Sequence, residues 1–153
     1  MKYSIDYPVL DTEQKEELEE RIKINGRKLI TAGSTREGEE KILIDIFKKI
    51  NEAEKYQMVL VPRHIQRTEE VAALCEGLDF SLYSENKKTE IIIVDKMGIL
   101  REMYQISDLV FVGGTFVEIG GHSILEPLYY GKVPIIGKYY SNIKDVAENA
   151  KPL

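Results

Sequence analysis

The sequence predicts an α/β protein with a doubly wound parallel sheet of about six strands. Short apolar runs alternate along the chain with stretches that have helical periodicity. The apolar runs are continuous rather than alternating with polar residues, which is typical of strands that helices cover on both faces. Strands and helices that alternate in this way favour a parallel sheet.

Composition is that of one globular domain of ordinary size. Of 153 residues, 43% are hydrophobic and 31% charged, which supports a core and argues against disorder. The net charge of −5 argues against a general nucleic-acid binder, whose affinity depends on phosphate neutralisation. The negative net charge is still compatible with binding of a small anion in a locally positive pocket. The single cysteine, Cys75, lies in an apolar helical pattern, which predicts a core residue rather than a nucleophile.

No targeting or membrane-spanning segment is expected in this chain. The N-terminus has no apolar stretch like that of a signal peptide. No run approaches the roughly 20 apolar residues that cross a bilayer. The expected location is therefore cytoplasmic.

The first elements are an extended arm and a helix. Residues 1–10 have no clear period, and a helix follows with Asp11 or Thr12 as N-cap and Asn25-Gly26 closing it. Further helices are expected at 39–55, 66–77, 98–106, 123–131 and 142–150. Strands are expected at 27–33, 57–62, 79–84, 90–95, 108–113 and 133–137. The commonest Rossmann-like order, 3-2-1-4-5-6, is the expected strand order.

Ligands of open parallel sheets bind beyond the carboxyl ends of the strands, so the loops that follow each strand are the candidate site. Both histidines of the chain, His64 and His122, fall in such strand-to-helix loops. The loop sequences are GST at 33–35, PRH at 62–64, DKMG at 95–98, GGT at 113–115 and GK at 137–138.

The stretch TAGSTREGEE reads as a strand end, a turn of small residues and a helix start. The hydroxyl groups of Ser34 and Thr35, with the N–H groups of the turn, could hold a phosphate at the helix N-terminus. An equally weighted alternative is plain N-capping by one of them, with the acidic residues 37–40 facing the positive end of the helix dipole. Neither a Walker lysine nor a GxGxxG motif follows, so a P-loop or dinucleotide fingerprint is not supported.

Two further loops carry weaker signals. Arg63 could bind a phosphate or a carboxylate through two parallel hydrogen bonds, and the alternative is a solvated loop arginine. The DKMG loop places Met97 and Gly98 where a nucleotide base could lie against backbone groups. The alternative there is a helix cap by Asp95.

The stretch FVGGTFVEIGGHSILEP combines two glycine pairs with a histidine and a glutamate. The glycines let the loop fold back and expose backbone N–H groups at the start of the next helix, which is an anion site. His122 could donate to a phosphate oxygen there. Glu126 lies one turn further on the same face, where a carboxylate suits the two hydroxyls of a ribose. The alternative is a structural turn with Glu126 as a helix-dipole partner.

These motifs, with VPRH and VDKMGILREMYQISD between them, strongly resemble the C-terminal half of bacterial 3-deoxy-D-manno-octulosonic acid (Kdo) transferases. The resemblance runs from about residue 25 to residue 147. It implies one of the two Rossmann-like domains of a GT-B glycosyltransferase. That family transfers Kdo from CMP-Kdo to the lipid A precursor in lipopolysaccharide biosynthesis, at the cytoplasmic face of the inner membrane, and its C-terminal half binds the nucleotide-sugar donor.

The resemblance also implies a role for each matching residue. The family usually has asparagine where this chain has Ser123, which can cap the helix and donate one hydrogen bond but reaches less far. The implied contacts are Ser34 and Thr35 near the phosphate, Arg63 and His64 near the phosphate or the Kdo carboxylate, Met97 and Gly98 against the cytosine, Gly120, Gly121 and His122 at the phosphate, and Glu126 on the ribose.

The resemblance further implies that residues 1–153 are a single donor-binding domain without the N-terminal acceptor half. The membrane anchor, the acceptor site and the catalytic base belong to that half, so this chain alone is expected to be inactive. No metal or cofactor is expected, because no D-x-D pair follows a strand. Alternatives are the C-terminal half of another GT-B glycosyltransferase or of an epimerase that uses a UDP- or GDP-sugar, a nucleotide-binding module that is not an enzyme, and an α/β domain without a ligand.

Overall fold

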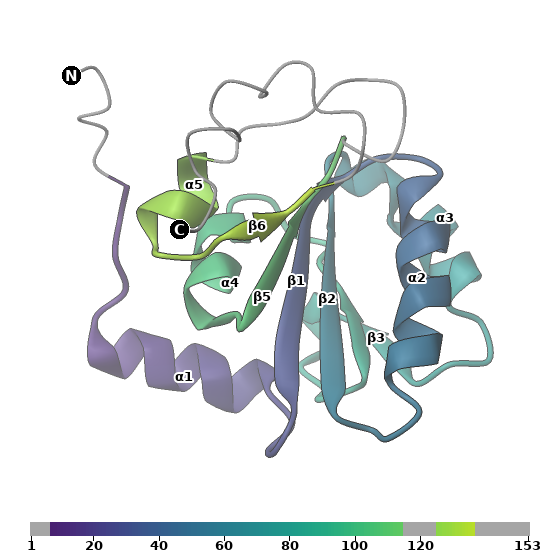
Figure 1. Cartoon of the computed structure of the whole chain (residues 1–153), viewed down its shortest axis with the longest axis horizontal. Helices are drawn as coiled ribbons and strands as arrows, with labels where there is room; N and C mark the ends of the chain where they lie inside the picture. Colours follow the sequence, from purple (N-terminus) through teal and green to yellow (C-terminus); the bar gives the residue numbers. More distant parts are fainter. Residues whose placement is uncertain (1–6, 115–124, 137–153) are drawn as a thin grey trace.

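The computed structural model, which describes residues 7–114 and 125–136, confirms the predicted α/β class. Six parallel strands form one sheet with helices on both faces (Figure 1). The strands are β1 (Lys28–Thr35), β2 (Tyr56–Pro62), β3 (Phe80–Leu82), β4 (Ile91–Ile93), β5 (Leu109–Val112) and β6 (Pro134–Ile135). The helices are α1 (Thr12–Ile22), α2 (Glu39–Ile50), α3 (Thr68–Leu74), α4 (Leu100–Ile106) and α5 (Leu125–Tyr129), with 3-10 turns at Ile65–Arg67 and Tyr83–Glu85. The helix expected at 142–150 lies outside the described residues.

The predicted strand order is wrong in one respect. The sheet runs β3-β4-β2-β1-β5-β6, so β4 rather than β3 lies beside β2. The difference follows burial, because all three isoleucines of β4 are buried, as suits a central strand, whereas only the middle residue of the equally short β3 is buried. Without β3, the other five strands keep the order expected of a Rossmann-like sheet. The chain therefore reverses direction across the sheet between β1 and β5.

The first helix begins as predicted and ends earlier than predicted. The Asp11 carboxylate accepts from the backbone N–H of Gln14, and the Gln14 side chain accepts from that of Asp11, which makes a capping box. The helix ends at Ile22, because Lys23 is already extended. Gly26, with a φ of +84°, belongs to the turn that leads into β1.

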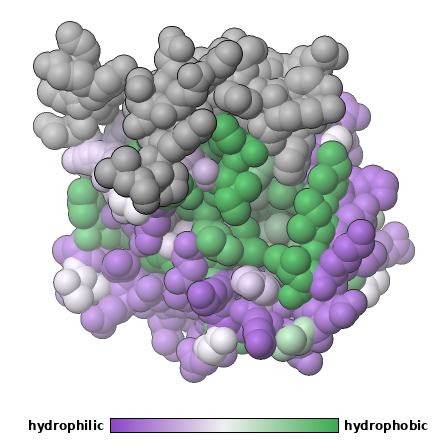
Figure 2. Space-filling model, in the orientation of Figure 1, coloured by the Kyte–Doolittle hydropathy of each residue, from purple (hydrophilic) through white to green (hydrophobic). Residues whose placement is uncertain are grey.

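Two apolar layers hold the helices against the sheet. On one face, Phe47 of α2 and Val71 of α3 pack with Leu60 and Ile93. On the other face, Ile22 of α1 and Met103 of α4 pack with residues that include Leu29, Val59 and Ile92. Helix α2 also carries a stripe of partly exposed isoleucines, and Figure 2 shows apolar surface on this side of the molecule. The stripe consists of Ile42, Ile46 and Ile50.

Cys75 is a buried core residue, as predicted, and burial raises the pKa of its thiol to about 11. We expect the native protein at pH 8 to resist an aromatic disulfide reagent, because thiolate is scarce and access is blocked. The unfolded chain in concentrated guanidinium should react at once. Since the folded-state pKa is raised, the thiol should also lower the free energy of unfolding as the pH rises from about 9 to about 11, which Cys75→Ala should abolish. Fast labelling of the native protein would contradict this assignment.

Gly33 of β1 faces the buried ring of Tyr104, and a Cβ at this position would collide with the tyrosine hydroxyl. We expect Gly33→Ala to lower the free energy of unfolding by about 2 kcal/mol, as overpacking does. Tyr104→Phe removes the colliding oxygen, so the double variant should lose less than the sum of the two single losses, measured by denaturant titration. Additive losses would show that the collision is not the cause.

Candidate functional site

The loops after β1, β2 and β5 meet at the carboxyl edge of the sheet, on the upper side of Figure 1. The backbone N–H of Arg63 donates to the carbonyl of Thr35 (2.8 Å), and the N–H of Gly113 donates to the carbonyl of Gly33 (2.7 Å). The edge thus brings Ser34, Thr35 and Arg63 together, as the strand-end argument predicts.

Ser34 and Thr35 do not cap the following helix, so that alternative is wrong. β1 continues to Thr35, and α2 begins at Glu39 after Gly38, which offers no side chain. Ser34 has a left-handed φ of +54° and stands where the pairing of β1 with β2 shifts register. Such rare backbone conformations cluster at ligand sites, which keeps Ser34 a candidate. The hydroxyl of Thr35 is buried and donates to Glu40 (2.8 Å).

Arg63 and His64 are both exposed at the end of β2. Within the described parts of the chain, neither side chain has a hydrogen bond or an ion pair. An exposed arginine and an exposed histidine at this edge suit an anion as hydrogen-bond donors. Their assignment to a phosphate or a carboxylate stays a prediction.

Met97 and Gly98 lie in the loop that precedes α4. Met97 is 72% exposed, an unusual position for a large apolar side chain, and Gly98 has a φ of +87° with open space where a Cβ would be. Asp95 does not cap α4, because its carboxylate accepts from the backbone N–H and the hydroxyl of Ser84. The loop therefore presents a flexible thioether and open backbone, which suits contact with a planar ring.

Glu126 of α5 forms an ion pair with Arg101 of α4, which sequence reasoning missed. The Nε of Arg101 donates to Oε2 of Glu126 (2.5 Å), and this hydrogen bond raises the pKa of Arg101. The guanidinium also lies 4.4 Å from the ring centroid of Tyr7. Oε1 of Glu126 accepts no hydrogen bond from any residue that the structure describes. Among the described residues, Arg101 thus holds one oxygen of Glu126 and nothing donates to the other.

The first glycine pair is used inside the protein, which corrects the expectation that both pairs expose N–H groups. The N–H of Gly113 donates to Gly33, and that of Gly114 donates to the Glu39 carboxylate (2.8 Å). A Cβ on Gly113 would collide with the backbone carbonyl of Ser34, so glycine is needed for close approach. The second pair, with His122 and Ser123, lies outside the described residues, so Gly120, Gly121, His122 and Ser123 stay predictions.

Glu39 and Glu40 are the second set that sequence reasoning missed. The sequence predicted only that they face the positive end of the helix dipole, whereas both are 0% exposed and hydrogen bonded. Glu40 accepts two hydrogen bonds from Arg67 (2.7 and 3.0 Å). The sequence has no periodicity that predicts burial of Glu39 and Glu40 and exposure of their neighbour Glu37.

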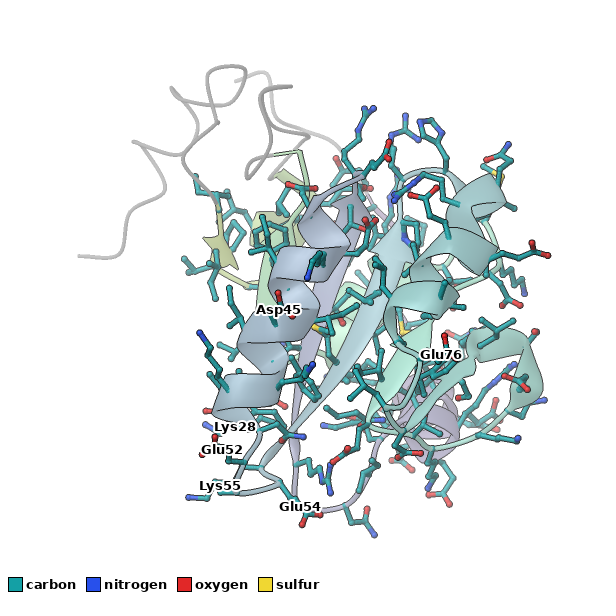
Figure 3. All side chains as sticks on the ribbon, turned by 90° about the vertical axis from the view of Figure 1, so that its right-hand side faces the viewer. Lys28, Asp45, Glu52, Glu54, Lys55 and Glu76 are labelled. Atoms are coloured by element: carbon teal, nitrogen blue, oxygen red, sulfur yellow. The ribbon has the colours of Figure 1, made fainter. Side chains whose placement is uncertain are left out.

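The opposite edge of the sheet has a pocket of about 280 Å³. Polar groups in this pocket already have hydrogen-bond partners within the protein, because Asn51 and Arg27 both donate to Glu90. Figure 3 shows Lys28, Glu54 and Lys55 at this lower end, away from the candidate site. In the two described ranges, no group of His, Cys, Asp and Glu could hold a metal ion, and no helix is long and apolar enough to cross a membrane.

Comparison with known proteins gives relatives over most of the chain, although no family model matches it. The chain is 44% identical, over 97% of its length, to a bifunctional glycosyltransferase/methyltransferase of Fusobacterium nucleatum, of which it spans 24%. It is 38% identical, over 83% of its length, to the 3-deoxy-D-manno-octulosonic acid transferase of Aquifex aeolicus, of which it spans 36%. The chain thus spans about a quarter to a third of these two relatives.

A solved structure has the same fold. The C-terminal CMP-Kdo binding domain of WaaA from Acinetobacter baumannii superposes with a TM-score of 0.80 at 30% sequence identity, over 89% of this chain and 75% of that one. Sequence and fold therefore agree with the resemblance found in the motifs. The chain belongs to the 3-deoxy-D-manno-octulosonic acid transferase family of glycosyltransferases and is similar to the C-terminal domain of its members.

Proposed function

We propose that this domain binds the nucleotide-sugar CMP-Kdo and is the donor half of an enzyme that transfers Kdo to the lipid A precursor. One observation carries the proposal. Arg63 and His64 are exposed at the sheet edge where the strand order reverses, in a domain whose fold matches that of a CMP-Kdo binding domain. Ligands of such sheets bind at this point.

Each group at the edge has a chemistry that fits one part of the donor. Oε1 of Glu126 suits the ribose hydroxyls as an acceptor, while Arg101 holds Oε2. Arg63 and His64 suit the phosphate or the sugar carboxylate. Met97 and Gly98 suit the cytosine ring. Ser34 precedes Thr35, whose carbonyl accepts from the Arg63 backbone N–H, so it lies on the phosphate side of the proposed site. Residues 120–123 are proposed to complete the phosphate contacts.

The proposed reaction needs little covalent chemistry from this domain. The acceptor hydroxyl attacks the anomeric carbon of Kdo, the bond from that carbon to the phosphate oxygen breaks, and CMP leaves with the electron pair. The hydroxyl proton goes to a base that we place in the acceptor half. Cationic groups at the carboxyl edge stabilise the charge that develops on the leaving phosphate. We further propose that the whole enzyme, with a lipid acceptor and a nucleotide-sugar donor, acts at the cytoplasmic face of the inner membrane.

The titration of this chain with CMP, UMP and GMP by calorimetry tests the proposal. We expect binding of CMP in preference to the other two, and a loss of about tenfold with Glu126→Gln, the value of a hydrogen bond to a charged group. Glu52→Gln is the matched control, because Glu52 is exposed at the opposite edge (Figure 3).

Tighter binding of UMP or GMP would instead assign the domain to a glycosyltransferase or an epimerase that uses another nucleotide-sugar. Absence of binding by all three would contradict the donor-site assignment for this chain.

Arg101→Met tests whether Arg101 acts through Glu126. The pair is partly exposed, so we expect a loss of CMP affinity of only about threefold, in line with surface ion pairs. In the Glu126→Gln background, Arg101→Met should cause no further loss. An equal loss in both backgrounds would show that Arg101 contacts the ligand itself.

A further inference from the structure

We propose that Glu39 and Glu40 are positioning residues that lock together the three loops of the donor site. The ligand in this inference rests on the proposed function, whereas the lock itself is a property of the ligand-free domain. Both residues begin α2, directly after Gly38, whose φ is +93°. Neither is exposed, so neither can contact a ligand directly.

Burial of two adjacent carboxylates requires a specific compensation. An ionised carboxylate away from water costs several kcal/mol unless hydrogen bonds and opposite charges replace its hydration. A helix N-terminus favours negative charge but does not require full burial. The partners of the two side chains are therefore the informative feature.

Glu39 joins the loop after β1 to the loop after β5. Its Oε1 accepts from the backbone N–H of Arg36 (2.8 Å) and from that of Gly114 (2.8 Å). Gly114 has a φ of +81° and immediately precedes the stretch that carries the predicted phosphate contacts. Glu39 thus fixes the point at which the chain leaves β5.

Glu40 joins the end of β1 to the loop after β2. Its Oε2 accepts from the Thr35 hydroxyl (2.8 Å) and from Nη1 of Arg67 (2.7 Å), and its Oε1 accepts from Nη2 of Arg67 (3.0 Å). Arg67 ends the 3-10 turn that follows Arg63 and His64. The two-pronged pair therefore anchors the loop that presents the exposed anion-binding candidates.

The two carboxylates together act on all three loops from beneath the site. Thr35 and Gly114 are engaged by them, while Arg63 and His64 are exposed and Ser34 is half-buried beside Thr35. A site that is ordered before its ligand arrives spends less binding free energy on ordering loops. Loss of the lock should therefore weaken nucleotide binding without removing any group that touches the nucleotide.

The test compares Glu39→Ala, Glu39→Gln and Glu40→Gln with Glu37→Gln, the matched control in the same loop, because Glu37 is exposed. Two quantities are measured well below the melting temperature of each variant. They are the amide hydrogen exchange of Arg36 and Gly114 without ligand, and the dissociation constant for CMP. Circular dichroism confirms that each variant is folded.

We expect Glu39→Ala to speed exchange at Arg36 and Gly114 and to weaken CMP binding by about tenfold, since a charged acceptor is lost from both amides. Glu39→Gln keeps an acceptor oxygen, so its CMP affinity should fall less. It replaces Glu39→Ala in the test if the alanine variant does not fold. Glu40→Gln loses charge opposite Arg67 and should weaken CMP binding while sparing the exchange of Gly114. Glu37→Gln should match the wild type.

Unchanged exchange and unchanged CMP affinity in folded Glu39 variants would overturn the proposal. Lower melting temperatures with an unchanged dissociation constant would show a purely structural role and would overturn it as well. If the wild type binds no nucleotide, the proposed function fails, and the exchange of Arg36 and Gly114 still decides whether the lock exists.

Discussion

The close approach of β1 and β5 is the constraint on which the carboxyl edge depends. Gly113 has no room for a side chain against the Ser34 carbonyl, and Gly33 has none against Tyr104. The short N–H to carbonyl bond between Gly113 and Gly33 forms only at this separation. It brings Gly114 within reach of Glu39, so three glycines and one buried carboxylate form one hydrogen-bonded unit.

Charge is divided between the inside and the outside of this edge. The protein is acidic overall, yet at this edge Glu39 and Glu40 are buried and hydrogen bonded. Arg63 and His64 stay exposed above them. Because internal donors hold the two carboxylates, the exposed groups that an anion would meet at this edge include Arg63 and His64 although the net charge is negative. The net charge of the chain does not show that these acidic groups are buried while these basic groups are exposed.

Sequence patterns predicted the layers of the fold well and the details of the edge less well. Continuous apolar runs such as IIIV are sufficient to indicate a buried parallel sheet. They do not predict the strand order, because β4 pairs with β2 and so leaves β3 at the edge of the sheet. Likewise, capping by Ser34 and a helix-dipole interaction of Glu40 are local alternatives. Propensity cannot distinguish them from the tertiary contacts that the structure shows.

The pairing of Glu126 with Arg101 shows why a ligand contact and its support differ in how well sequence predicts them. A glutamate one turn after GGHS is visible as a motif, but the arginine that orients it lies 25 residues earlier, on another helix. Only the parallel crossover from α4 through β5 to α5 brings the two together. A carboxylate held at one oxygen has fewer accessible rotamers, so the proposed contact of Glu126 with the ribose hydroxyls would cost less side-chain entropy. The motif thus identifies Glu126 as a candidate ligand contact, whereas the topology of the fold determines that Arg101 is its partner.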